Sequence, residues 1–274
     1  MEINLIALAI PFFFLLIGVE LLVARRKRVR VYRFNDSIND LSCGIMQQVL
    51  GVFTGAAILF FYSYLYHNHR FLEISTSSVL AWIGLMLGVD FFYYWYHRFA
   101  HEVAFLWAAH VVHHQSEEYN LSVALRQGAL QPLQSWVFYL PLAVFGFPPA
   151  MFVTVLSINT LYQFWIHTRV VDRMGWLEWI LNTPSHHRVH HGRNTAYLDT
   201  NYAGMLIIWD RMFGSFAPEI EPPVYGVIKP IASWNPLWAN VHVWRELLQK
   251  ARTAPRWWDS IRVWFKSPSW SPPW

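Results

Sequence analysis

Long apolar stretches separated by short polar segments run through the first two thirds of the chain. Residues 3–24 form the first stretch, which is long enough to cross about 30 Å of hydrocarbon as one helix. Others lie at about 43–66 and 78–96, and two shorter ones fill 131–167 around the string GFPPA. This pattern predicts an all-α integral membrane protein with about four transmembrane or hairpin helices. The last pair is compatible with two tilted spans or with a helical hairpin that dips into the bilayer.

The distribution of basic residues predicts the orientation of these helices. Six basic residues directly follow the first apolar stretch: Arg25, Arg26, Lys27, Arg28, Arg30 and Arg33. The positive-inside rule places such a loop in the cytoplasm, whereas the loop 67–76 has only Arg70 and suits the other side. A signal peptide is the weaker interpretation of residues 3–24, because no basic residue precedes them and no small-residue cleavage site follows. We therefore expect residues 97–114, 167 and 186–191 at the cytoplasmic face.

Composition supports a membrane protein and excludes several kinds of site. Of the 274 residues, 55% are hydrophobic and 14% are charged, against about 25% charged in soluble domains. The formal charge of +4 belongs to basic residues that flank apolar segments, which favours a membrane surface over nucleic acid as the partner. Cys43 is the only cysteine, so an internal disulfide or a cysteine-rich metal site is excluded. Any bound metal must use histidine and carboxylate.

The C-terminal part, about 234–274, repeats Trp beside Arg and Lys. An amphipathic helix in the headgroup region has this composition, and a Trp-rich segment packed on the protein itself is the alternative. We find no internal repeat and no low-complexity linker. The chain is therefore expected to form a single domain over 1–274, with a histidine-rich core at about 90–216.

Ten of the 13 histidines gather in three spaced clusters and one position at the end of an apolar stretch. The clusters are the strings HRFAH, HVVHH and HRVHH, in which i, i+3 and i+4 positions share one helix face. The candidate ligands are His97, His101, His110, His113, His114, His167, His187, His190 and His191, with His186 as an additional ring. His67, His69 and His242 stand apart, and we interpret them as interfacial or structural.

This number of imidazoles predicts a two-metal site. Imidazole suits Zn, Cu, Fe and Ni, and eight or more nitrogens exceed what one tetrahedral ion needs. Two metals beside a bilayer indicate oxygen chemistry on an apolar substrate, and hydrolysis by a metal pair is an alternative. A metal transporter would place its ligands at mid-membrane, whereas these clusters follow the spans. A non-catalytic metal scaffold is a third possibility.

Charged residues near the clusters are candidates for supporting the rings. Metal-bound histidine usually donates its other N–H to a carboxylate or carbonyl, and Glu102, Asp90 and Asp199 are placed to accept it. The alternatives are a solvated charge for Glu102 and Asp199, and helix pairing for Asp90. Three arginines, namely Arg126, Arg188 and Arg193, are expected to hold either lipid phosphate or acidic side chains. We identify no catalytic residue beyond the metal ligands.

The motifs HxxxH, HxxHH and HxxHH resemble the signature of the membrane fatty acid hydroxylase and sterol desaturase superfamily. Residues around them are most similar to the alkylglycerol monooxygenases and their bacterial relatives, in strings such as HHQSEEYNLSVALRQ and LNTPSHHRVHHGRN. The similarity covers about 90–216.

The resemblance implies a di-iron centre that activates O2 and hydroxylates a lipid chain, either a fatty acyl, an alkyl ether or a sterol-like one. It implies that the eight motif histidines bind iron and that His167 and His186 complete the set. Desaturation is the alternative within the family. The chain carries no fused cytochrome b5-like domain, so an external reductant is expected, either tetrahydrobiopterin or a cytochrome b5/ferredoxin-type carrier. The membrane would be the endoplasmic reticulum or the bacterial inner membrane. The sequence identifies no residues that bind the reductant and no oligomeric state.

Overall fold

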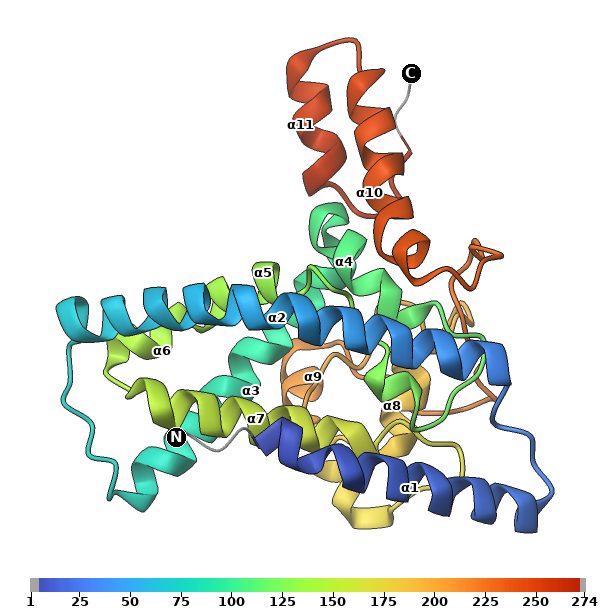
Figure 1. Cartoon of the computed structure of the whole chain (residues 1–274), viewed down its shortest axis with the longest axis horizontal. Helices are drawn as coiled ribbons and strands as arrows, with labels where there is room; N and C mark the ends of the chain where they lie inside the picture. Colours follow the sequence, from blue (N-terminus) through green and yellow to red (C-terminus); the bar gives the residue numbers. More distant parts are fainter. Residues whose placement is uncertain (1–4, 272–274) are drawn as a thin grey trace.

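The computed structural model describes residues 5–271, and regular structure in this range is helical apart from one isolated bridge between Leu181 and Leu206. Three helices are long and apolar enough to cross a membrane, namely α1 (Leu5–Lys27), α2 (Phe34–His69) and α3 (Val79–Glu102). The predicted all-α integral membrane fold is confirmed. Figure 1 shows α1 and α2 both running along the long axis of the molecule.

Lipid-facing character is clearest in α1. Only Glu20 and Ala24 of this helix are buried, whereas large apolar side chains such as Phe12 and Leu22 are more than half exposed. Such a surface is costly in water but favourable against acyl chains. The contacts of α1 within the protein are mainly with α7 (Pro149–Trp165).

Helix α2 begins nine residues before the apolar stretch predicted at 43–66. Its first turns carry Asp36, Asn39 and Asp40, and all three side chains are buried. These polar groups are hydrogen-bonded to partners from distant segments, for example Ser122 to Asp40 at 2.7 Å. Because their partners come from tertiary structure, local hydrophobicity gives no sign that the helix extends through them.

The two shorter apolar stretches at 131–167 form a helical hairpin. Its first arm consists of α5 (Pro132–Ser135), the 3₁₀ turn η2 (Trp136–Tyr139) and α6 (Leu140–Phe145), and its second arm is α7. The arms turn at Gly146, whose φ of 104° is in the left-handed region that glycine tolerates. At this tip the N–H of Phe71 donates to the carbonyl of Val144 at 2.8 Å. The hairpin therefore reaches the loop that joins α2 and α3.

An apolar core ties the hairpin to α2 and α3. Its buried members are Tyr62, Leu85, Val89, Tyr139, Leu142, Ala143, Met151, Phe152 and Val155. Tyr62 stacks on Phe152 with ring centroids 4.3 Å apart. Gly88 of α3 lies directly against the Leu142 side chain, where a Cβ would be 2.8 Å from the Leu142 Cδ2 atom. This close approach holds α6 firmly against α3.

Short helices and loops form a cap beyond the ends of α3 and α7. They are α4 (Ala104–His114), the 3₁₀ turns η1 (Val123–Leu125) and η3 (Gly175–Trp179), α8 (Pro184–His190), α9 (Ile208–Phe213), α10 (Pro236–Arg252) and α11 (Trp257–Phe265). Helices α10 and α11 form a second hairpin, which projects from the body at a steep angle to α2 (Figure 1). The cap brings the three histidine motifs together.

Candidate metal centre

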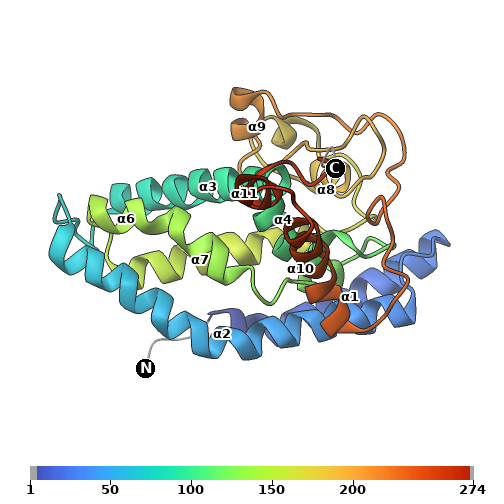
Figure 2. The same cartoon turned by 90° about the horizontal axis from the view of Figure 1, so that it is seen from above.

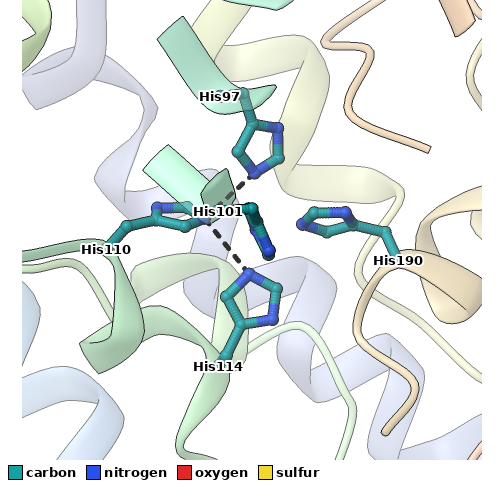
Figure 3. A group of neighbouring side chains, drawn as sticks. All are labelled: His97, His101, His110, His114 and His190. Atoms are coloured by element: carbon teal, nitrogen blue, oxygen red, sulfur yellow. Dashed lines mark hydrogen bonds between the residues drawn. The ribbon is translucent and has the colours of Figure 1, made fainter. Parts of the chain in front are cut away.

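Five histidines from three helices form the first group of converging rings. The end of α3 contributes His97 and His101, α4 contributes His110 and His114, and α8 contributes His190. One ring nitrogen of each lies within 4.8 Å of the others, and all five side chains are buried. Figure 3 shows the rings pointing toward a common centre. The i, i+4 spacing places both members of each pair on one helix face, as the sequence predicted.

Four further histidines form a second group. His113 comes from α4, His167 follows the end of α7, and His187 and His191 come from α8 and its C-terminal cap. These rings are also buried, and their ligand atoms likewise lie within 4.8 Å of one another. The HxxHH spacing explains how α4 and α8 serve both groups, since neighbouring residues of one motif point to adjacent centres.

Backbone carbonyls fix the orientation of several rings. The Nδ1–H of His97 donates to the carbonyl of Tyr202 at 2.7 Å, that of His113 to Arg126 at 2.9 Å, and that of His167 to Gln163 at 2.7 Å. A carbonyl only accepts, so the proton of each neutral ring is on Nδ1 and the lone pair of Nε2 points into the group. This arrangement is typical of metal-bound histidine.

The Nε2 lone pairs of neighbouring rings face each other, and neither nitrogen carries a proton that could form a hydrogen bond between them. The Nε2 atoms of His113 and His167 are 3.1 Å apart. Burial lowers the pKa of His113 to about 4 and that of His167 well below its usual value, so both rings are neutral at neutral pH. Two buried lone pairs at this distance repel one another unless a cation lies between them. The donor set therefore fits a bound metal.

The nitrogen separations also fit metal coordination. The Nε2 atom of His110 is 3.0 Å from that of His97 and 3.1 Å from that of His114, and His187 and His167 approach to 2.9 Å. Nitrogens that bind one ion at about 2.1 Å with angles of about 90° lie about 3.0 Å apart, whereas tetrahedral angles give about 3.4 Å. These separations are in the range expected for nitrogens that share one metal ion. The buried Nε2 atoms of His101, His190 and His191 lack a hydrogen-bond partner and are free to bind it.

His186 is not brought into either group, although the sequence placed it among the ligands. Its side chain is buried, and its ring meets Phe216 edge-on with centroids 5.4 Å apart. It borders a cavity that Arg173, Glu178 and Arg211 also line. Around the axis of α8, His190, His187 and His191 lie next to one another on one face. His186 lies about 40° beyond His190, at the edge of this face.

The three carboxylates predicted to support the histidine rings have different partners in the structure. The Asp199 carboxylate is 3.7 Å from the Nδ1 atom of His101, which is close enough for electrostatic support but long for a hydrogen bond. Glu102 pairs with Arg98 at 2.9 Å instead of with a histidine. Asp90 accepts from the backbone N–H of Met205 at 2.7 Å, so it holds α3 to the cap rather than a ring.

The three arginines proposed to hold lipid phosphate are engaged within the protein. Arg126 is buried against Asp40 at 3.1 Å, and Arg188 pairs with Glu219 at 2.7 Å. Arg193 donates to the carbonyl of Val227 at 3.3 Å. Of the two partners expected for these arginines, lipid phosphate or acidic side chains, the structure shows acidic side chains at Arg126 and Arg188. The sequence did not identify the backbone carbonyls that support the histidine rings, such as those of Tyr202 and Gln163, because a residue of any type can supply a carbonyl.

Comparisons with known proteins agree with this geometry. Residues 82–215 match the fatty acid hydroxylase family. The chain is 45% identical over 265 residues to alkylglycerol monooxygenase of Homo sapiens, and 44% identical over 264 residues to that of Xenopus tropicalis; each match covers 96% of this chain and 59% of the relative. An ornithine lipid hydroxylase of Rhizobium tropici is 30% identical over 57% of this chain and 47% of its own length. No solved structure matches. The chain thus spans about three fifths of the length of the vertebrate relatives.

Proposed function

The chain carries a fatty acid hydroxylase domain at residues 82–215, and from that premise we propose that it is an O2-dependent membrane monooxygenase that hydroxylates a lipid chain at a di-iron centre. The observation that carries the proposal is the pair of buried histidine groups beside the ends of the apolar helices. Nine rings in two groups provide for two ions, and the lone pairs that face each other within the groups favour bound cations.

Two bound iron ions would supply the redox centre for O2 chemistry. The overall reaction converts a C–H bond and O2 to C–OH and water, and it consumes two electrons and two protons. We propose that an external donor supplies the electrons, either tetrahydrobiopterin or a cytochrome b5/ferredoxin-type carrier. The names of the vertebrate relatives make an alkylglycerol the first substrate to test.

The protein's own residues hold the centre and keep water out. Burial keeps the imidazoles neutral, as ligands must be, and backbone carbonyls hold their tautomers. Aromatic side chains enclose the groups: Trp107 contacts the rings of His101 and His114, and Tyr119 that of His191. An apolar chain would enter from the bilayer between the helices. The centre would face the cytoplasm, because the basic loop 25–33 marks the cytoplasmic end of α1.

Desaturation is the second candidate. Human lathosterol oxidase is 28% identical over 50% of this chain, and a sterol 5(6)-desaturase of Gibberella zeae is 27% identical over 54%. These matches are weaker than those to the monooxygenases. The two reactions differ in product, since hydroxylation adds one oxygen atom and desaturation removes two hydrogens.

The proposal is tested with purified protein in lipid nanodiscs. The iron-loaded protein is incubated under air with an alkylglycerol, a fatty acyl lipid or a sterol, and with each class of reductant, and products are identified by mass spectrometry. We expect a hydroxylated lipid or its breakdown product. His110→Ala should reduce its formation by more than about 100-fold, beyond the usual cost of losing a supporting residue. The control is His69→Ala, since this exposed ring is outside both groups. Full activity of the His110 variant would refute the site.

A further inference from the structure

Helix α11 presents an exposed face that is entirely apolar. Trp257, Trp258, Ile261 and Phe265 are 70%, 41%, 48% and 67% exposed. At about 100° per residue they fall within one arc of about 100° on the helix. Asp259 and Val263, on the other side, are the buried residues of this helix.

Helix α10 has a similar stripe. Leu237, Val241 and Leu248 are 63%, 47% and 44% exposed, and they fall within an arc of about 40°. Exposed apolar residues gathered on one face of each of two neighbouring helices are unusual on a protein surface that meets water.

The hairpin does not need this surface for its own folding. A separate cluster joins it to α4, in which Ala104, Ala108, Leu247 and Val263 are buried. Trp244, Trp264 and Trp270 pack against that cluster. The Trp-rich tail therefore divides its aromatic residues between a face packed on the protein and a face left uncovered.

The hairpin contacts the membrane helices where their apolar parts begin or end. Its Lys266 carbonyl accepts from the N–H of Ala104 at 2.9 Å, two residues after the end of α3. At its other end, Ala239 packs with Cys43, the residue at which α2 changes from a polar to an apolar sequence. Figures 1 and 2 show α10 and α11 standing roughly at right angles to α2 and α7. With α2 crossing the bilayer, a hairpin at right angles to it would run along the membrane surface and not across the bilayer.

Charge distinguishes the hairpin from the rest of the molecule. Residues 236–266 contain six basic residues and two acidic ones, which leaves 15 of each sign elsewhere, so the hairpin accounts for the whole formal charge of +4. Arg245 and Arg252 lie at the edge of the apolar stripe on α10. The guanidinium of Arg256 lies over the ring of Trp258 at 5.4 Å, and that of Arg245 lies over Trp238 at 5.8 Å. Basic and aromatic residues in this arrangement favour an anionic headgroup layer.

We propose that the α10–α11 hairpin is an interfacial anchor that lies in the headgroup layer of an anionic bilayer. Trp257, Ile261 and Phe265 insert at the acyl boundary, and the surrounding arginines and lysines bind lipid phosphates. Because the hairpin packs on α4, it holds the helix that carries His110, His113 and His114 at the membrane surface. The proposal goes beyond lipid hydroxylation: it requires α1–α3 to cross the membrane but not that the metal groups catalyse a reaction.

The test uses single cysteines in the full-length chain. The native Cys43 is fully buried, so it should not react with a thiol dye in the folded protein. Trp257→Cys and Phe265→Cys place a fluorescent label on the apolar face. Glu246→Cys is the matched control, because residue 246 is exposed and is about 180° around α10 from Leu237. Each labelled protein is reconstituted in nanodiscs of phosphatidylglycerol or phosphatidylcholine, and quenching by brominated acyl chains and by aqueous iodide is measured.

We expect the labels at 257 and 265 to be quenched severalfold more by brominated lipid than the label at 246, which iodide should quench instead. This difference should be larger in phosphatidylglycerol than in phosphatidylcholine, and Arg252→Gln/Arg256→Gln should reduce it. Labels at both 257 and 265 that iodide reaches and lipid does not would overturn the proposal. Shielding of these labels from both quenchers would also overturn it, since a protein would then cover this face. Equal quenching in the two lipids would refute the anionic preference.

Discussion

The position of single protons decides what the histidines do. Where a carbonyl accepts from Nδ1, as at His97, His113 and His167, the Nε2 lone pair is left facing other nitrogens. A loop of surface histidines would instead exchange these hydrogen bonds with water. Spacing in the sequence predicted which rings share a helix face, and nine of the ten predicted rings lie in the two groups. His186 lies outside both groups, although it is also four residues from His190.

Metal content should distinguish ligands from their neighbours. His113→Ala removes one of four nitrogens from the second group, so we expect it to lower the iron content measured by mass spectrometry by about one ion per chain. His186→Ala should keep the wild-type content, because this ring is outside both groups. An unchanged content in the His113 variant, or a loss in the His186 variant, would contradict the assignment.

Acidification should destabilise the metal-free protein. Burial lowers the pKa of His113 from 6.5 to about 4, and burial lowers that of His190 to about 3. Between about pH 6.5 and 4 the unfolded chain therefore binds more protons than the folded chain, and the free energy of unfolding falls as the pH is lowered. We expect the unfolding temperature of chelator-treated protein to fall through this window, with a smaller change in iron-loaded protein. A midpoint that stays constant or rises toward pH 4 would contradict this linkage.

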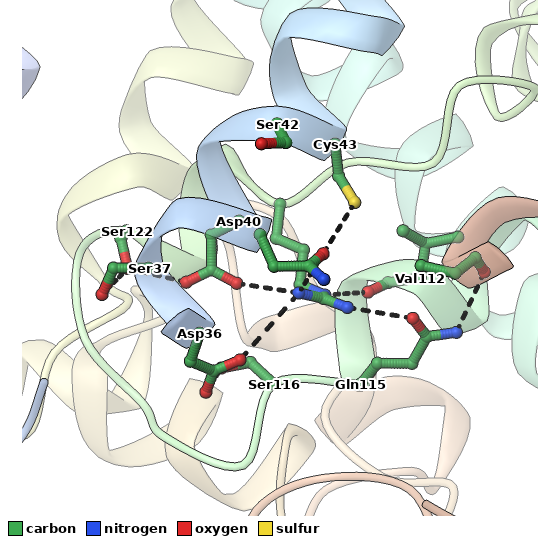
Figure 4. A network of polar contacts seen from close by, with 12 residues as sticks. Asp36, Ser37, Asp40, Ser42, Cys43, Val112, Gln115, Ser116 and Ser122 are labelled. Atoms are coloured by element: carbon green, nitrogen blue, oxygen red, sulfur yellow. Dashed lines mark hydrogen bonds and ion pairs between the residues drawn. The ribbon is translucent and has the colours of Figure 1, made fainter. Parts of the chain in front are cut away.

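A buried polar network joins helix α2 to the site, and Figure 4 shows two of its members, Asp40 of α2 and Val112 of α4. The Arg126 guanidinium donates to Asp40 and Asn39 at 3.1 Å each and to the carbonyl of Val112 at 2.6 Å, while its own carbonyl accepts from His113. This network links α2, α4 and the segment after η1. The local sequence around Asp40 does not identify Arg126 as its partner, because the two residues are far apart in the chain.

Loss of Arg126 should be costly. Arg126→Met leaves buried carboxylates without their cation, and breaking a buried pair in this way costs about 3–5 kcal/mol. Arg70→Met is the matched control: its pair with Glu73 at 2.9 Å is at the surface, where the Glu73 side chain is 87% exposed, and such pairs contribute at most about 1 kcal/mol. We expect a large fall in the unfolding temperature only for the Arg126 variant. Similar shifts for both variants would show that the buried network contributes no more than a surface pair.

Across the whole molecule, apolar stretches and motif spacing were sufficient to predict the helical membrane fold and the meeting of the histidine motifs on one side. Tertiary contacts decided the rest. The sequence left open whether 131–167 forms two tilted spans or a hairpin, and the hairpin became evident from the contact of its tip, at Val144, with Phe71 of the α2–α3 loop. Asp90 proved to be bound by Met205 of the cap. Partners of this kind are distant in sequence, so periodicity carries no information about them.

The most direct test of the central claim is the origin of the oxygen in the product. Purified, iron-loaded protein in nanodiscs is supplied with the lipid that it converts, a reductant and ¹⁸O2, and the product is analysed by mass spectrometry. A monooxygenase with two occupied histidine groups should incorporate one ¹⁸O atom per hydroxylated lipid, and chelation of the metal should abolish the product. A product that carries oxygen from water, or that forms equally well after the metal is removed, would contradict the account.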